Sequence, residues 1–327
     1  MRIKSFAKIN LGLEILGRRP DGYHDIRTLF QWIELHDVLT IGENDGPAVT
    51  LGGDDPEVPW DETNLIARAA RRLQAETGTG RGAVIRVEKH IPAGRGLAGG
   101  SGNAAMALLG LNVFWELGLD AAALDRLGAE LGADVPFFFR GGLCLGEGIG
   151  DRLTPLADLP PLHCVLAIPP FPVPTARIYA NLNWEKNAAG CPSPALTSGG
   201  EVGKMGRFFE TGEFVSLEND LERTIFRFYP QLQEIKRFFK DQGAELSLVT
   251  GSGSAVYGLF RDRAAAGRCL EAAAGRIPAV LTETVGRERG WREIEAGVSP
   301  SGKAAGFGPA IRGFESSRPS FMIHKKT

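Results

Sequence analysis

The sequence predicts an α+β protein built from two domains. Segments with a two-residue apolar period occur in both halves and are mixed with segments of helical period. A proline-rich stretch from Leu153 to Pro174 separates the halves, and 327 residues exceed what one ordinary core organises. We therefore expect an N-terminal domain over residues 1–156, a C-terminal domain over 157–290, and a disordered basic tail over 291–327.

The N-terminal half begins with a strand pattern. Apolar residues alternate with polar or small ones from Ala7 to Ile15, which places Lys8 and Asn10 on one face of a strand. A turn-rich stretch over residues 19–24 separates it from a second β-rich segment over 25–35. Residues 64–73 predict an amphipathic helix, and a strand over 84–89 leads into a run of glycines.

The C-terminal half has weaker patterns. We expect a short buried strand around 165–168 and helices near 202–209 and 231–239. Residues 246–260 predict a strand, a glycine turn at 251–253 and a second strand.

Composition excludes several classes of protein. The chain is 43% hydrophobic and 23% charged, with a formal charge of −2, which is typical of a globular protein. This balance gives no general attraction to nucleic acid or to an anionic membrane. No apolar run reaches membrane-spanning length, and the four cysteines lie far apart without a metal-ligand spacing. We expect a cytoplasmic protein.

The glycine-rich stretch is the main candidate for function. Residues 91–103 read IPAGRGLAGGSGN and precede an apolar helix. Such a loop can turn backbone N–H groups toward an anion, and the helix N-terminus adds partial positive charge. The spacing fits neither a Walker A loop nor a Rossmann loop. The alternatives are a flexible connection or close helix packing, and Ser101 could be an N-cap.

Other candidates each allow a plain structural interpretation. Lys8 is either a catalytic cation or a solvated strand residue. Asp134 is either a general base or an N-cap before Pro136. Tyr23 and His24 either contact a ligand base or anchor a hairpin, and Gly251–Gly253 is either an anion-binding turn or a simple hairpin loop.

Taken in chain order, these segments resemble the GHMP kinase superfamily over residues 3–285. The resemblance implies an N-terminal domain like domain 2 of ribosomal protein S5, a ferredoxin-like C-terminal domain and an active site between them. It implies transfer of phosphate from ATP, with Mg²⁺, to an alcohol. The segment Asp21-Gly22-Tyr23-His24 indicates members whose alcohol carries a cytidine diphosphate group, in the non-mevalonate route to isoprenoid precursors. The segments that carry the resemblance are 7–11, 17–24, 91–112, 131–137 and 251–253.

The resemblance also implies roles for individual residues. Lys8 and Asp134 match the catalytic pair, and Ser101 matches a possible Mg²⁺ contact. The ATP-binding set is Asn64, Leu65, Pro92, Ala93, Gly94, Arg95, Gly96, Leu97, Ala98, Gly99, Gly100, Ser101, Gly102 and Asn103. The substrate-binding set is Asn10, Tyr23, His24, Thr175, Tyr179, Gly251, Ser252 and Gly253, with Tyr179 at the place for an aromatic ring against cytosine.

Three residues depart from the superfamily pattern. Arg95 stands where a small residue is usual, Ala98 where glycine is usual and Gly102 where a second serine is usual. Ala98 is tolerated beside phosphate only with a negative φ, whereas Arg95 could add a cation near the triphosphate. We therefore expect an active enzyme with altered ATP affinity.

Two other functions stay open at this point. One is a superfamily kinase for another small alcohol, such as homoserine or mevalonate. The other is a nucleotide-binding homologue without catalysis. The partner is a small molecule rather than nucleic acid or membrane, and the chain is a monomer or a homodimer.

Overall fold

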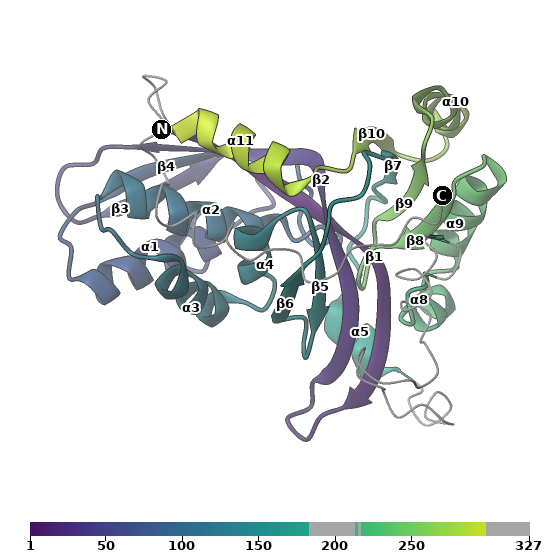
Figure 1. Ribbon diagram of the computed structural model, residues 1–327, viewed down its shortest axis with the longest axis horizontal. Helices are drawn as coiled ribbons and strands as arrows, with labels where there is room; N and C mark the ends of the chain where they lie inside the picture. The colour runs from purple at the N-terminus through teal and green to yellow at the C-terminus, as the bar shows by residue number, and fades with distance from the viewer. Residues whose placement is uncertain (183–212, 215–216, 299–327) are drawn as a thin grey trace.

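Two β-sheets organise the computed structural model, which describes residues 1–182, 213–214 and 217–298 (Figure 1). The first sheet has strand order β3-β4-β2-β5-β6, and β1 pairs with β2. Strands predicted over 7–15, 25–35 and 84–89 are confirmed, although β1 and β2 extend further. The strands are β1 (Arg2–Arg18), β2 (His24–Gly42), β3 (Val49–Gly53), β4 (Ala83–Glu88), β5 (Leu143–Glu147) and β6 (Arg152–Pro155).

The antiparallel pair of β1 and β2 forms a long ribbon. In its register Lys8 faces Trp32 and Asn10 faces Phe30 across the two strands. The ribbon runs past the other strands of its sheet, so its turn lies beside α5 (Thr175–Ala180) of the C-terminal half (Figure 1). One continuous element therefore carries residues to two parts of the molecule.

Four helices pack together in the N-terminal half: α1 (Leu65–Thr77), α2 (Gly99–Phe114), α3 (Ala121–Leu131) and α4 (Val135–Arg140). Asn64 caps α1 by accepting a 2.9 Å hydrogen bond from the Ile66 N–H, so the predicted helix over 64–73 is confirmed. Helix α2 contacts both β1 and β2 and is buried along most of its length, which explains why its sequence is apolar on every side.

The second sheet is antiparallel, with order β10-β7-β9-β8. Helices lie in the connections before β8 and before β10, while a short turn joins β8 to β9, which gives the predicted β-α-β-β-α-β pattern of a ferredoxin-like domain. The predicted helix at 202–209 lies outside the described residues. The elements are β7 (His163–Ala167), β8 (Leu246–Val249), β9 (Val256–Phe260), β10 (Ala279–Glu283), α8 (Glu222–Phe228), α9 (Pro230–Asp241) and α10 (Arg263–Ala273).

A buried apolar cluster joins the two sheets. Ala7, Ile9 and Leu11 of β1 belong to the same cluster as Leu248 and Tyr257 of the second sheet. The Tyr257 hydroxyl also donates a 2.8 Å hydrogen bond to the Asn10 carbonyl oxygen. Strand β1 is therefore shared by both domains, and residues along it lie at their junction.

The expectation of a disordered tail from residue 291 is wrong for residues 291–298. These residues complete α11 (Arg287–Val298), in which Trp291, Ile294 and Val298 enter the core of the N-terminal half. The Val285 N–H also bonds the Trp32 carbonyl oxygen at 2.9 Å. The chain thus returns to the first domain after β10, so the expected end of the second domain at 290 is also wrong. Residues 299–327 lie outside the described part.

None of the helices in the described ranges is long and apolar enough to cross a lipid bilayer.

Candidate active site

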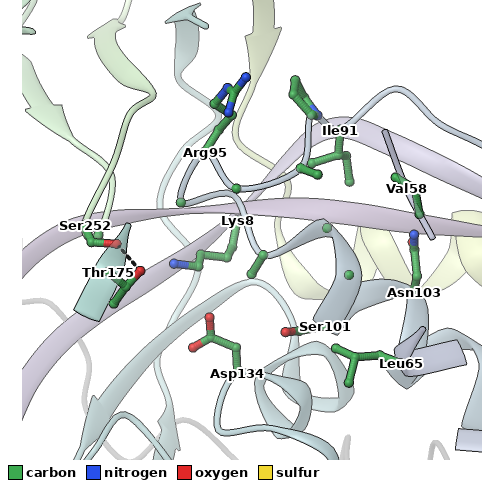
Figure 2. Close-up of a pocket in the computed structure, with 18 of the residues that line it drawn as sticks. Lys8, Val58, Leu65, Ile91, Arg95, Ser101, Asn103, Asp134, Thr175 and Ser252 are labelled. Carbon is green, nitrogen blue, oxygen red and sulfur yellow. Dashed lines mark hydrogen bonds between the residues drawn. The ribbon is translucent and has the colours of Figure 1, made fainter. Parts of the chain in front are cut away.

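A cavity of about 490 Å³ lies where the two domains meet (Figure 2). Its walls come from β1, the glycine loop, the start of α4 and the turn between β8 and β9. A second cavity of about 780 Å³ adjoins it at the β1–β2 turn. The two share Ile26, Ile149, Thr175 and Tyr179 as common walls. The two cavities are therefore neighbours.

Lys8 is buried at the centre of the first cavity. Its ammonium donates a 2.7 Å hydrogen bond to Oδ1 of Asn10 and lies 5.3 Å from the centre of the Phe30 ring. Burial lowers the pKa of Lys8, and the negative charge of Asp134 opposes that shift. The predicted shared face of Lys8 and Asn10 is confirmed, and the alternative of a solvated strand lysine is wrong.

Asn10 connects Lys8 to both domains. Its Nδ2 donates a 2.8 Å hydrogen bond to Oγ1 of Thr28, which itself donates to the Gly12 carbonyl oxygen. The Asn10 backbone N–H donates to Oγ1 of Thr250 at 3.1 Å. Because the carboxamide is held by these contacts, its oxygen is fixed as the acceptor for Lys8.

Asp134 occupies the N-cap position of α4, but its side chain makes no capping hydrogen bond. Pro136 stands in the first turn of α4, as the sequence predicts. The carboxylate instead faces the cavity, on the side where Lys8 and Ser101 lie (Figure 2). The position was predicted correctly, whereas the capping role is wrong, so the carboxylate stays available for chemistry.

The glycine loop is held against the C-terminal domain. A Cβ on Gly96 would lie 2.3 Å from the Thr250 carbonyl oxygen, and its φ is +80°. The Thr250 hydroxyl donates to the Gly96 carbonyl oxygen at 3.2 Å, and the Ala255 N–H donates to that of Arg95 at 3.1 Å. These contacts contradict the alternative of a flexible connection. The loop backbone lines the cavity and leads directly into α2.

Ala98 differs from the expectation of a negative φ. Its φ is +54°, in the left-handed region, and it is the N-cap of α2. Ser101 is therefore inside the first turn of the helix, so the N-cap interpretation of Ser101 is wrong. A Cβ in this region is strained, which is why glycine is usual at such a position.

Two residues of the predicted ATP-binding set face the protein instead of the cavity. The Gly102 N–H donates to the Ala98 carbonyl oxygen at 2.9 Å, and a Cβ on Gly102 would lie 2.9 Å from Oγ of Ser5. The Leu97 side chain is buried, and its carbonyl oxygen accepts from the Lys8 N–H. Neither residue lines the cavity. Gly102 thus fits the packing of α2 on β1.

The remaining loop residues line the cavity as predicted, but Arg95 has an unexpected direction. Its side chain extends from the loop away from Lys8 and Asp134 (Figure 2). The guanidinium is therefore not placed beside the two central residues.

An apolar slot occupies the end of the cavity near α1. Val58, Leu65 and Asn103 lie at this end (Figure 2), and Trp60 and Asn64 also line the cavity. The sequence prediction included Asn64, Leu65 and Asn103 but missed Val58 and Trp60. The apolar pair in the proline-containing loop before the α1 cap was the available clue.

The second cavity brings together four of the eight residues predicted for substrate, Tyr23, His24, Thr175 and Tyr179. The rings of His24 and Tyr179 lie 5.3 Å apart, and Tyr23 is 62% exposed at its edge. Tyr23 therefore does not anchor the hairpin. Burial, aided by the charge of Arg18, lowers the pKa of His24, which favours a neutral imidazole.

The turn between β8 and β9 closes the first cavity on this side. Oγ1 of Thr175 and Oγ of Ser252 lie 2.7 Å apart (Figure 2), and Gly251 has a φ of +57° beside Asn10. Gly251 and Ser252 line the cavity, whereas Gly253 does not. The turn is both a hairpin loop and a wall of the site.

Asn219 holds this turn and was not predicted from the sequence. Its Nδ2 donates to the carbonyl oxygens of Val249 at 2.9 Å and Gly251 at 2.7 Å. The residue is distant in sequence from every recognised segment, so only the fold reveals its contact.

Comparison with known proteins identifies the family. The model of the GHMP kinases N terminal domain matches residues 64–142, and that of the GHMP kinases C terminal domain matches residues 204–278. The 4-diphosphocytidyl-2-C-methyl-D-erythritol kinase of Pelobacter propionicus is 40% identical over 265 residues, which cover 80% of this chain and 90% of that protein. The chain belongs to the 4-diphosphocytidyl-2-C-methyl-D-erythritol kinase family.

Other members of the kinase family give the same result. The one from Moorella thermoacetica is 40% identical over 87% of this chain and 97% of its own length. A crystal structure of 4-(cytidine 5'-diphospho)-2C-methyl-D-erythritol kinase is 34% identical, with a TM-score of 0.72 over 88% of this chain and all of that one. Homoserine kinase from Cytophaga hutchinsonii, at 18% identity and a TM-score of 0.65, shares the fold. The predicted two-domain GHMP kinase architecture is confirmed.

Proposed function

We propose that this chain transfers the γ-phosphoryl group of ATP to the 2-hydroxyl of 4-diphosphocytidyl-2-C-methyl-D-erythritol, in the non-mevalonate route to isoprenoid precursors. One observation carries the proposal. Buried Lys8 and Asp134, whose side chain makes no capping hydrogen bond, lie in a cavity between a glycine loop and the pocket of His24 and Tyr179. Family membership supports the same activity, because the relatives are named for it.

Phosphoryl transfer requires positioning and stabilisation of negative charge. Backbone N–H groups of the loop and the N-terminus of α2 would hold the phosphates of ATP. Lys8 would orient the acceptor hydroxyl and add a positive charge beside it. Asp134 would accept the hydroxyl proton, since its carboxylate faces the cavity without a capping bond.

The donor set at the site fits Mg²⁺ bound mainly through phosphates. The described residues contain no group of three or more His, Cys, Asp or Glu side chains that could hold a metal. A nucleotide-bound Mg²⁺ needs only one or two protein oxygens. Ser101, which lines the cavity, would supply one, which leaves Asp134 to accept the hydroxyl proton. The ion would neutralise charge on the transferred phosphoryl group.

The second cavity would receive the cytidine group. A neutral His24 presents one donor and one acceptor, and the adjacent Tyr179 ring presents a flat apolar face. Such a pair suits stacking and hydrogen bonding to a pyrimidine. Thr175 and Ser252 lie between this pocket and Lys8, where they would contact the substrate phosphates.

Phosphate transfer from labelled ATP to a panel of alcohols tests the proposal. We expect turnover of the cytidine-bearing substrate and little turnover of homoserine or mevalonate. Tyr179→Leu should raise the KM for the cytidine substrate about tenfold by removing a stacking face, with little change in the KM for ATP. Tyr229→Leu is the matched control, because Tyr229 stacks on Phe171 and lines neither cavity. Equal turnover of all three alcohols would contradict the proposed substrate.

We further propose that the enzyme works in the cytoplasm on small molecules alone. The nearly balanced charge supports the lack of a nucleic-acid partner. Sedimentation of the full chain at several concentrations distinguishes a monomer from a homodimer.

A further inference from the structure

Thr250, at the start of the turn between β8 and β9, is fully buried and lines neither cavity. Its Oγ1 accepts a 3.1 Å hydrogen bond from the Asn10 N–H of β1. The same oxygen lies 3.2 Å from the Gly96 carbonyl oxygen of the glycine loop and 3.2 Å from Oδ1 of Asn10. One buried hydroxyl of the C-terminal domain therefore contacts both β1 and the loop.

The hydroxyl proton of Thr250 has two acceptors within reach. A threonine hydroxyl carries one proton, and Oδ1 of Asn10 already accepts from the Lys8 ammonium at 2.7 Å. Among the described residues, Thr250 is the one donor to the Gly96 carbonyl oxygen. Donation to Gly96 thus leaves both acceptors paired, whereas donation to Asn10 leaves one unpaired. The favoured arrangement is a chain of hydrogen bonds from β1 through the hydroxyl to the loop.

The chain at Thr250 is one of three that hold successive residues of the loop. The carbonyl oxygens of residues 95–97 accept, in that order, from the Ala255 N–H at 3.1 Å, the Thr250 hydroxyl and the Lys8 N–H at 3.1 Å. Of these donors only Thr250 uses its side chain. It is therefore the one contact that a substitution can remove while the backbone bonds on either side stay in place.

The C-terminal domain fixes the position of Thr250. Nδ2 of Asn219 donates to the carbonyl oxygens of both its neighbours, Val249 at 2.9 Å and Gly251 at 2.7 Å. The Thr250 N–H itself donates to the Ala255 carbonyl oxygen at 3.0 Å. Because the backbone is bonded on both sides of Thr250, the hydroxyl is presented to β1 and to the loop from a fixed point.

We propose that Thr250 is a positioning residue for phosphoryl transfer, because its hydroxyl sets the glycine loop in a fixed place relative to Lys8 and Asn10. The proposal rests on the proposed function, in which the loop holds the phosphate donor and Lys8 orients the acceptor hydroxyl. Transfer needs the reacting atoms to be aligned, and a displacement of about 1 Å can lower the rate about a hundredfold. Binding of either ligand alone does not need that alignment.

Thr250→Val removes the hydroxyl and keeps the shape of the side chain. We expect the single-turnover rate of transfer from saturating ATP to fall about 10–100-fold. Calorimetry should give dissociation constants for ATP and for the acceptor within about threefold of those of the unchanged protein, because the loop keeps its bonds to Ala255 and Lys8. Thr250→Ser, which keeps a hydroxyl, should restore the rate to within about threefold.

Two results would overturn the proposal. One is an unchanged rate in folded Thr250→Val, and the other is a loss of ATP affinity as large as the loss of rate. If Thr250→Val does not fold, the same measurements on Thr250→Ala decide, and an unchanged rate in that variant would overturn the proposal.

Thr284→Val is the matched control. Thr284 is also buried, and its Oγ1 accepts a 2.9 Å hydrogen bond from the Leu162 N–H instead of from β1. This variant should lose stability and keep the transfer rate. The acceptor in all these measurements is the alcohol that the unchanged protein phosphorylates fastest. Failure with the cytidine substrate would therefore contradict the proposed function alone, and an unchanged rate in Thr250→Val would contradict the role of Thr250 alone.

Discussion

The Lys8 ammonium donates a 2.7 Å hydrogen bond to the side-chain oxygen of Asn10, two residues away on the same face of β1. Burial lowers the pKa of Lys8, and Asp134 limits this shift by stabilising the charged form. The cation is thus kept at the centre of the site by one hydrogen bond and one nearby carboxylate.

We expect activity to decline at alkaline pH as Lys8 loses its proton. The midpoint should lie below the ordinary lysine pKa of 10.5, because burial favours the neutral form. Lys8→Arg should lower kcat but remove this decline, since arginine stays protonated throughout the range. The measurement is kcat against pH for both proteins. An identical alkaline decline in Lys8→Arg would contradict the assignment.

The same lowered pKa affects stability. Between the lowered pKa and 10.5 the unfolded chain binds a proton at Lys8 that the folded chain does not, so the free energy of unfolding rises with pH in this window. Lys8→Met should lack that rise. Urea denaturation of both proteins at several pH values measures the difference, and parallel curves would argue against a lowered pKa.

Asp134→Asn should reduce kcat by about 10²–10⁴-fold, the typical effect of losing a general base, with a small change in stability. Stability should hold because the Asp134 side chain makes no capping bond in α4. Steady-state kinetics and thermal denaturation provide the two readouts.

Asp120→Ala is the matched control for Asp134. Asp120 is the N-cap of α3 and accepts a 2.8 Å hydrogen bond from the Ala123 N–H. Its loss should cost about 1 kcal/mol of stability and leave kcat unchanged. If Asp134→Asn also lost stability and kept kcat, Asp134 would be a structural cap.

Gly96→Ala should weaken ATP binding at least tenfold. The new Cβ would lie 2.3 Å from the Thr250 carbonyl oxygen at a φ of +80°, so the loop must leave its contact with the C-terminal domain. Calorimetric titration with ATP measures the effect. Gly267→Ala, in α10 with nothing near the added Cβ, should keep ATP affinity and gain about 0.5–1 kcal/mol of stability. Unchanged ATP affinity in Gly96→Ala would mean that the loop can move without loss.

Ala98→Gly should stabilise the protein by about 1 kcal/mol, because it removes a Cβ from the left-handed region. Ala122→Gly should instead lower the free energy of unfolding by about 1 kcal/mol, because Ala122 is an exposed residue inside α3 and glycine disfavours a helix interior. Denaturant titration of the three proteins compares them. Destabilisation by both changes would show that the conformation at Ala98 is not strained.

Much of the fold could be predicted from the sequence, because local patterns are strong where one face is buried. The alternation around Lys8 placed β1, and the pattern of residues 64–73 placed α1. The end of the second domain was wrong because α11 is mostly polar, and only three spaced apolar residues, Trp291, Ile294 and Val298, reach the core. Composition alone cannot distinguish such a helix from a solvated tail.

The sequence by itself determined the family, since Lys8, Asp134 and the glycine loop occur in recognisable segments with fixed order. The tertiary structure decided which of these face the cavity, because neighbours distant in the chain set the direction of each group. In the structure Gly102 faces the protein interior, and the Asp134 side chain makes no capping hydrogen bond to α4. Ala98 has a positive φ. Only packing brings buried Asp37 to Asn103, 66 residues away in the sequence.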